Sequence, residues 1–175
     1  MKERASLQEQ VEAALSAIIG MPIWGAGRAV NMEMFDIGDR VEKTSRYGET
    51  IQVGAYAIHV QCPWRVIGPE GIAVGSIDAH YPPSVREGDE SFDSNNDSSL
   101  CEEKMSAWLE RRGGEPLFIR SVAADESGGF RLGLSGGYSV DVMPASSRPD
   151  YEHWRLIGPG TGRRTHFVVA GRNVV

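Results

Sequence analysis

Apolar and polar residues alternate along the chain with two different periods, one typical of helices and one typical of strands. The first apolar stripe has helical spacing and consists of Leu7, Val11, Ala14, Leu15 and Ile18. Ser6 and Glu9 have the spacing of a capping box, in which each side chain binds a free backbone amide of the first turn. Gly20 and Pro22 follow the stripe, so the pattern predicts a helix that begins after Ser6 and ends before Gly20.

From residue 28 the period changes to two. The alternating positions are Val30, Met32 and Met34 on one side and Asn31 and Glu33 on the other. This alternation predicts a half-buried strand that ends at Gly38, with the valine and the methionines on its apolar face. A polar turn region is expected over residues 39–49.

Residues 51–67 carry the clearest strand pattern of the chain. Its apolar side chains occupy even positions: Tyr56, Ile58, Val60, Cys62, Trp64 and Val66. His59, Gln61 and Arg65 occupy odd positions, so an extended chain separates the two sets onto opposite faces. Pro63 has no amide to donate, so we expect the strand to bend or to lie at an edge there. "GPEG" is then a turn, and "IAVGSI" is the returning strand.

The second half of the chain repeats this order of elements. Residues 81–97 are rich in proline, serine, asparagine and acids, which predicts a flexible acidic linker. Ser99 and Glu102 form a second capping pair before an apolar stripe of Cys101, Met105, Trp108 and Leu109, and Gly113 and Gly114 end this helix. Five strand candidates follow: "PLFIRSVA", "GFRLGLS", "YSVDVM", "HWRLI" and "THFVVAG".

Two stretches of sequence occur twice in the same order. "GAYAIHV" from Gly54 matches "GGYSVDV" from Gly136, and "WRVIGPEG" from Trp64 matches "WRLIGPGTG" from Trp154. Self-similarity in a fixed order indicates repeated units. We therefore predict one domain over residues 1–175, of the α+β class. It has two pseudo-repeated halves (5–80 and 98–172), each one helix plus a short antiparallel β-meander, and the halves share one core that holds both tryptophans.

Composition narrows the classes of function. The chain has 24 acidic and 18 basic residues and a net charge of −6, without the basic stripe that nucleic acid requires, so no nucleic-acid partner is expected. No apolar run is long enough for a membrane span, and the acids near the N-terminus argue against a signal peptide. Two cysteines form no disulfide framework and suit a reducing compartment, so the expected location is cytoplasmic.

The polar face of the repeated strands is the candidate site for chemistry. It gathers His59, Arg65, Asp141, His153 and Arg155. Two arginines at equivalent places could hold a carboxylate or phosphate, because each guanidinium offers a planar fork of donors. The alternative interpretation is a solvated sheet face with scattered ion pairs.

Other motifs are weaker on inspection. Cys62 and His59 are three residues apart on a strand and point to opposite faces, which argues against a thiol–imidazole pair. Asp93, Asn95 and Asp97 have the spacing of a calcium loop, but serine and lysine replace its glycine and its glutamate. "GPGTGRRT" and "GAGRAV" lack the contexts of phosphate loops, and no zinc spacing occurs, so no metal or cofactor is expected.

The stretch "HVQCPWR" at His59–Arg65 resembles a signature of small, uncharacterised bacterial proteins. "EHWRLI" near the C-terminus is similar to the tails of some of these and of certain immunity-type proteins. The resemblance implies a bacterial cytoplasmic protein and transfers no catalytic residue. We expect a non-enzymatic binding protein with a protein partner, immunity-like or regulatory. The alternative is an enzyme or a small anionic-ligand binder that uses the polar face. The sequence indicates no oligomeric state.

Overall fold

The structure is a computed structural model that describes residues 5–110, 115–159 and 165–175. Within these residues the chain combines helices with one antiparallel sheet, and strands outweigh helices. The α+β expectation is therefore confirmed in its coarse form, with more sheet than two short meanders would supply. The strands are β1 (Pro22–Ala29), β2 (Met32–Thr44), β3 (Thr50–Val60), β4 (Trp64–Gly68), β5 (Gly71–Gly75), β6 (Leu117–Ala124), β7 (Phe130–Leu134), β8 (Ser139–Val142), β9 (Glu152–Gly158), β10 (Thr165–Ala170) and β11 (Asn173–Val174).

Both predicted helices form, and both begin as the capping pattern predicts. Helix α1 (Leu7–Leu15) has the full capping box between Ser6 and Glu9, and a 3₁₀ turn at Ser16–Ile18 extends it. Helix α2 (Leu100–Glu110) begins where the Glu102 carboxylate accepts a bond of 2.8 Å from the Ser99 amide. The glycines predicted to end α2 lie outside the described residues.

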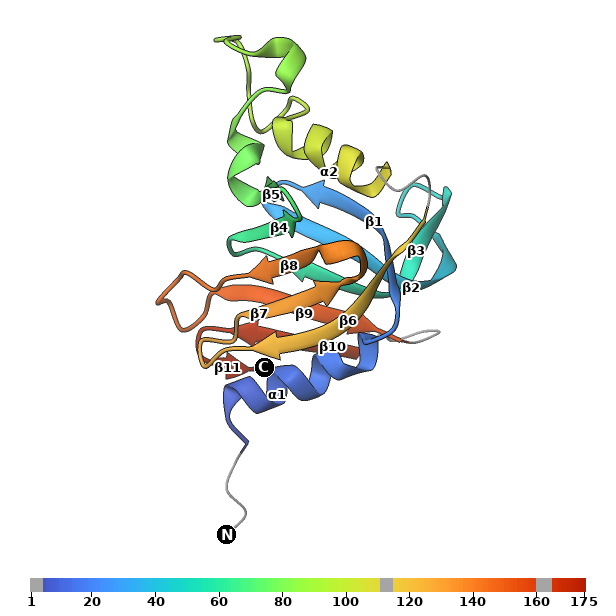
Figure 1. Ribbon diagram of the computed structural model, residues 1–175, viewed down its shortest axis with the longest axis vertical. Coiled ribbons are helices and arrows are strands. Elements are labelled where there is room, and N and C mark those ends of the chain that lie inside the picture. Colours follow the sequence, from blue (N-terminus) through green and yellow to red (C-terminus); the bar gives the residue numbers. More distant parts are fainter. Residues whose placement is uncertain (1–4, 111–114, 160–164) are drawn as a thin grey trace.

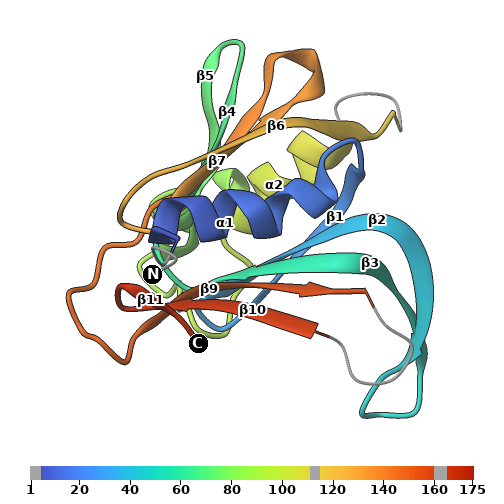
Figure 2. The same cartoon turned by 90° about the horizontal axis from the view of Figure 1, so that it is seen from below.

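The sheet folds over into two layers that enclose the core. The strand order is β11-β10-β9-β3-β2-β1-β6-β7-β8-β4-β5, and only two residue pairs join β1 to β6. At this narrow join the sheet divides into two layers that face each other (Figure 2). One layer contains β1, β2, β3, β9 and β10, and the other contains β4, β5, β6, β7 and β8. The helices cover opposite ends, α1 against β6 and β11, and α2 against β1 and β5 (Figure 1).

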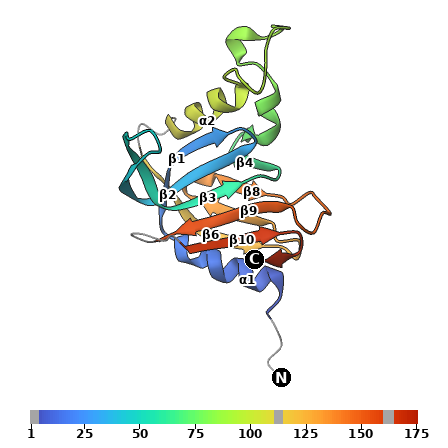
Figure 3. The ribbon, with the colours of Figure 1, turned by 180° about the vertical axis from the view of Figure 1, so that it is seen from behind.

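The strand order has an internal correspondence. Strands β1–β5 form a first run, and each has a counterpart in a second run, β6–β10. If the counterparts exchange places and the order is then read from the other end, the order of these ten strands is unchanged. The hairpin β4–β5 pairs with β8 of the other run through β4. In the other layer, which faces the viewer in Figure 3, β9 pairs with β3. Each run of strands therefore completes the layer of the other.

The pairing registers of these exchanged hairpins are the same. Trp64 and Trp154 lie opposite Val142 and Val60, the last residues of the two repeated "G-x-Y" segments. Arg65 lies opposite Asp141 in the same way that Arg155 lies opposite His59. Both tryptophans are buried, as predicted, and each meets a phenylalanine ring edge to face.

The repeated glycine of "WR-φ-IG" has a packing role at the other end of the same pairing. A Cβ atom on Gly158 would lie 2.3 Å from the ring of Tyr56, and one on Gly68 would lie 2.9 Å from the ring of Tyr138. The glycine in each hairpin therefore makes room for the tyrosine of the other run's "G-x-Y" segment. The two repeated motifs are contact partners of each other.

The prediction for residues 28–38 is wrong in two respects. Glu33, Phe35 and Ile37 are the buried side chains of β2, whereas Val30 is 78% exposed, so the apolar face is the odd-numbered one. The strand also continues beyond Gly38, whose positive φ of 81° accompanies a bulge, and extends to Thr44 through part of the expected turn. Strand β1 was not predicted, because four of its eight residues are glycine or alanine and give no clear alternation of apolar and polar side chains.

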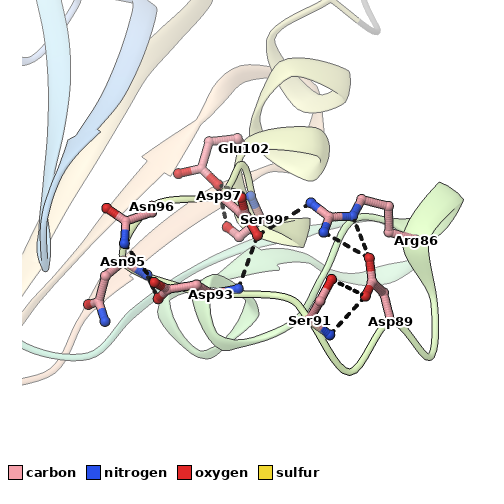
Figure 4. Close-up of polar contacts among 9 residues, drawn as sticks. All are labelled: Arg86, Asp89, Ser91, Asp93, Asn95, Asn96, Asp97, Ser99 and Glu102. Atoms are coloured by element: carbon pink, nitrogen blue, oxygen red, sulfur yellow. Dashed lines mark hydrogen bonds and ion pairs between the residues drawn. The ribbon is translucent and has the colours of Figure 1, made fainter.

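Residues 81–97, predicted as a flexible linker, form a compact loop beside α2 with its own polar contacts (Figure 4). Arg86 pairs with Asp89 at 2.8 Å and with Asp97 at 3.4 Å. The Asp93 carboxylate accepts bonds from the backbone of Asn95 and the side chain of Asn96. Turns of this kind form without an apolar core, and the flexibility of this segment stays a prediction.

Candidate functional site

A cavity of about 310 Å³ lies where the β1–β2 turn, the β3–β4 connection and the start of α2 meet. Its walls combine the charged Arg28 and Glu33, the aromatic Trp64, and the thiols of Cys62 and Cys101. His80 and several neutral polar residues also line it: Asn31, Gln61, Ser76, Ser94 and Asn95. The last two belong to the loop over residues 81–97, so this loop forms one wall.

Glu33 is the unusual side chain of this cavity. It is only 3% exposed, because it occupies the core-facing parity of β2 together with Phe35 and Ile37. No hydrogen bond to its carboxyl group occurs among the described residues. Burial and then the charge of Glu102 raise the pKa of Glu33, the charge of Arg28 lowers it, and the net result is a pKa of about 8.

Arg28 does not satisfy this carboxyl group, although the two residues lie directly opposite each other on β1 and β2. Its Nε donates to Glu102 at 2.6 Å, and its Nη1 donates to the carbonyl oxygen of Val30 at 3.1 Å. Glu102 in turn accepts hydrogen bonds from the amide and the hydroxyl of Ser99. The guanidinium group of Arg28 is therefore paired with Glu102 and not with Glu33.

The corresponding place in the other run of strands has a different composition. Phe130 lies opposite Val142 at the register where Glu33 lies opposite Val60. Ala124 lies opposite Phe130 where Arg28 lies opposite Glu33. An Ala–Phe pair at one place thus corresponds to an Arg–Glu pair at the other.

The two tryptophans reflect this difference. Trp154 packs on Phe130 with ring centroids 4.8 Å apart, and its indole N–H donates to the Gly128 carbonyl at 2.8 Å. Trp64 packs on Phe35 at 5.6 Å and lines the cavity, and its indole N–H has no hydrogen-bond acceptor among the described residues. The space beside Trp154 is filled by Phe130, whereas the space beside Trp64 is a cavity with polar groups in its wall.

Neither thiol in the cavity wall is a ready nucleophile. Burial raises the pKa of Cys62 and that of Cys101 to about 12 in each case. The thiolate is the reactive form of cysteine, so both groups are protonated and inert at neutral pH. His59, which the sequence analysis separated from Cys62 by strand parity, does not line this cavity.

The residues predicted to form one polar face are divided between the two layers. Arg65 donates to Asp141 at 3.0 Å on β4 and β8, and Arg131 of β7 donates to the same carboxylate at 2.6 Å. These hydrogen bonds from Arg131 and Arg65 lower the pKa of Asp141. The cluster is a satisfied ion pair on the outer side of one layer.

His59 and Arg155 lie opposite each other on β3 and β9, in the other layer. Arg155 forms an ion pair with Glu152 and contacts Nδ1 of His166 at 3.2 Å. Burial and then the Arg155 charge lower the pKa of His59. Each arginine already has an acidic partner, and the core separates the two outer faces (Figure 2).

His153 belongs to neither cluster. It is 1% exposed, its Nδ1 has no hydrogen-bond partner, and its ring lies 5.3 Å from that of Tyr151. The structure therefore brings together Arg65 with Asp141 and His59 with Arg155, and it assembles no site from all five predicted residues.

In the described part of the chain, no group of three or more histidine, cysteine, aspartate or glutamate side chains is arranged to hold a metal ion. The carboxylates of the calcium-like segment, Asp93 and Asp97, bind backbone and side-chain groups of their own loop. Among the described helices, none has the length and apolar character that crossing a membrane requires.

Comparison with known proteins leaves the site to be interpreted from its geometry alone. No protein-family model matches the chain. No curated protein matches it, and no solved structure matches it.

Proposed function

We propose that this chain is a non-enzymatic binding protein that holds a small molecule in the cavity between Glu33 and Trp64. The observation that carries this proposal is Glu33, a residue that is only 3% exposed, whose carboxyl group has no hydrogen-bond donor among the described residues and borders a cavity of about 310 Å³. Ligand sites of proteins are cavities of about this size or larger, with a few polar groups that fix the ligand's orientation.

The cost of burying Glu33 supports a binding role. An ionisable group in an apolar surrounding destabilises the fold unless a partner compensates it. The corresponding position of the other run shows the structural solution, a phenylalanine that packs on the tryptophan. A ligand that supplies donors to Glu33 would compensate the buried acid, because its groups replace the water lost on folding.

The chemistry of the cavity favours binding over catalysis. Its two thiols are held in the protonated form by burial, and its arginine is paired with Glu102. Covalent catalysis requires a nucleophile that is hydrogen-bonded to an activating base, and among the described residues no hydrogen bond joins His80 to a cysteine or serine of this cavity. The expected protein partner, the cytoplasmic location and the exclusion of nucleic acid stay predictions.

We further propose that residues 5–80 and 98–172 are copies of one ancestral unit. Three observations support this: the strand order that survives exchange of the two runs, the equal registers of the two exchanged hairpins, and the glycine–tyrosine contacts made twice. On this view the Arg28–Glu33 pair is a specialisation of the first unit, because the corresponding residues of the second unit, Ala124 and Phe130, form an apolar pair.

Glu33→Phe tests the proposed function. We expect the variant to fold and to unfold at a higher temperature than the wild type, since it replaces a buried acid with the side chain used at Phe130. In thermal-shift assays against amines, amino acids, sugars and nucleosides, compounds that stabilise the wild type should not stabilise the variant. Glu126→Gln, which removes one negative charge from an exposed turn, is the control and should bind as the wild type does. A compound that stabilises Glu33→Phe as much as the wild type would place the ligand elsewhere.

A further inference from the structure

We propose that the ligand of this cavity is a small organic cation, an amine or amidine, whose charged head binds Glu33 and whose apolar body lies against Trp64. The inference rests on the proposed function and names the class of ligand. Three features of the cavity carry it: the charges that are free to pair, the supply of hydrogen-bond donors, and the aromatic wall.

Glu33 is the acid of the cavity wall that has no basic partner among the described residues. Arg28, Glu33 and His80 are the lining residues of the described chain with acidic or basic side chains. Arg28 is joined to Glu102 at 2.6 Å, so its charge is already balanced. An anionic ligand would lie beside the Glu33 carboxyl group with no unpaired arginine to hold it, whereas a cation would find its counter-charge there.

The protein supplies Glu33 with no donor among its described residues, so donors are what the ligand must bring. An ionised carboxylate accepts hydrogen bonds at two oxygens, and an ammonium group carries three N–H donors and no acceptor. An amidinium group offers parallel N–H donors that match both oxygens at once, as a guanidinium does. Either head satisfies the carboxyl group completely.

Trp64 gives the remainder of the ligand an apolar surface. Its side chain lines the cavity beside Ile77, Ala79 and Pro63. Tryptophan is the side chain whose ring attracts organic cations most strongly, and it also packs well against other rings. The chemistry of the walls thus fits a compact molecule with one cationic end and one apolar or aromatic end.

Binding of a cation to Glu33 also changes the protonation of the site. The free carboxyl group, with a pKa of about 8, holds its proton at neutral pH. When a cation binds, the O–H bond of Glu33 breaks, the carboxylate pairs with the ligand, and the proton passes to the buffer. At pH 7 about 0.9 proton is released for each molecule bound, as follows from a pKa one unit above the pH.

The protonation of Glu33 must be distinguished from that of the titratable groups near it. The site is surrounded by six other titratable groups: Cys101 and Glu102 on α2, Cys62 on the β3–β4 connection, Asp78 and His80 after β5, and Arg28 on β1. Both thiols stay protonated below pH 9 because burial raises the pKa of each to about 12. His80→Gln removes the histidine that shares the cavity, so this variant is the control for its contribution.

Calorimetric titration of the full chain with benzylamine and benzamidine tests the inference. Benzyl alcohol and benzoate are the neutral and anionic probes of similar shape. We expect both cations to bind, with an affinity that rises about tenfold per pH unit between pH 6 and 7, rises less steeply towards pH 8 and levels off above it. Titration at pH 7 in buffers of different ionisation heat should show release of about one proton. Glu126→Gln should keep both effects, and Glu33→Gln should lose the pH dependence and at least tenfold in affinity. A pH dependence that is lost in His80→Gln and kept in Glu33→Gln would overturn the pairing with Glu33.

The outcomes separate the ligand class from the proposed function. Equal binding of benzyl alcohol and benzylamine, affinity that is the same at pH 6 and 8, or no binding of either cation at millimolar concentration would overturn the cationic ligand. If another class of compound then stabilises the wild type and not Glu33→Phe, the cavity still binds a ligand. Binding of the cations by Glu33→Phe with wild-type affinity would overturn both.

Discussion

Glu33 is only 3% exposed, so its carboxyl group retains its proton at a higher pH than the same group in water, and this property affects the whole protein. The sequence pattern placed Glu33 on the polar face of its strand, because Met32 and Met34 occupy the alternate positions. The odd positions, however, carry Phe35 and Ile37, and these bulky side chains gain more from burial than the methionines do. Glu33 follows them inward.

The pH dependence of stability should reveal this group. Its pKa is about 8 in the folded protein and near the ordinary 4.5 in the unfolded chain, so the folded state binds the proton more tightly. The stabilisation that the proton provides is complete below about pH 4.5 and is lost as the pH rises to about 8. Relative to Glu33→Gln, the wild-type free energy of unfolding should fall by about 1.4 kcal/mol per pH unit in this window.

Urea denaturation of both proteins between pH 5 and pH 9 measures this difference. Glu126→Gln, at an exposed position, should follow the wild type at every pH. Parallel curves for wild type and Glu33→Gln would mean that Glu33 ionises normally in the folded protein.

At the scale of elements, the contacts between repeated motifs hold the exchanged hairpins in register. Strand β9 carries Trp154 at one end, where it lies opposite Val60, and Gly158 at the other, where it contacts Tyr56. Strand β4 makes the corresponding contacts through Gly68 and Tyr138. A one-residue slip in either pairing would turn each tryptophan out of the core, so the two ends together specify the register.

Alanine substitutions should destabilise the protein in the order of these contacts. A Cβ at position 158 would lie 2.3 Å from the Tyr56 ring, and one at position 68 would lie 2.9 Å from the Tyr138 ring. We expect Gly158→Ala to cost about 1–3 kcal/mol and Gly68→Ala to cost less, because overpacking forces a ring or a strand to move. Thermal and urea unfolding measure both.

Gly27→Ala is the matched control, since a Cβ there meets no atom within 4 Å in a strand of the same sheet. It should leave stability almost unchanged. If Gly158→Ala is as stable as Gly27→Ala, the glycine–tyrosine contact does not determine the pairing.

At the scale of the whole molecule, each run of strands lacks a complete layer of its own. Strands β1–β3 are extended by β9 and β10, and β6–β8 are extended by β4 and β5. Helix α1 lies principally against β6 and α2 against β1 and β5, so each helix also covers the other run. The core is therefore built at the interface of the two runs and belongs to neither alone.

Separate fragments should consequently behave differently from separate domains. We expect chains of residues 1–97 and 98–175 to remain unfolded alone, because each exposes apolar surface that only the other buries. When mixed, they should recover the circular dichroism and the cooperative unfolding of the full chain. Cooperative unfolding of either fragment by itself would contradict this account of the core.

The sequence by itself determined the local elements and showed that two motifs are repeated in the same order. Capping residues, strand alternation and turn glycines act over a few neighbours, so the helices at Ser6 and Ser99, the bend at Pro63 and the burial of both tryptophans could be predicted. Only the tertiary structure decided which layer each hairpin joins, because strand pairing depends on residues far apart in the chain. That exchange placed Arg65 and Arg155 on separate faces, and it set Glu33 beside Trp64 at the place where the other run has Phe130 beside Trp154. The duplicated motifs were the available signal for this site, and a comparison of the two runs position by position becomes possible only when their registers are known.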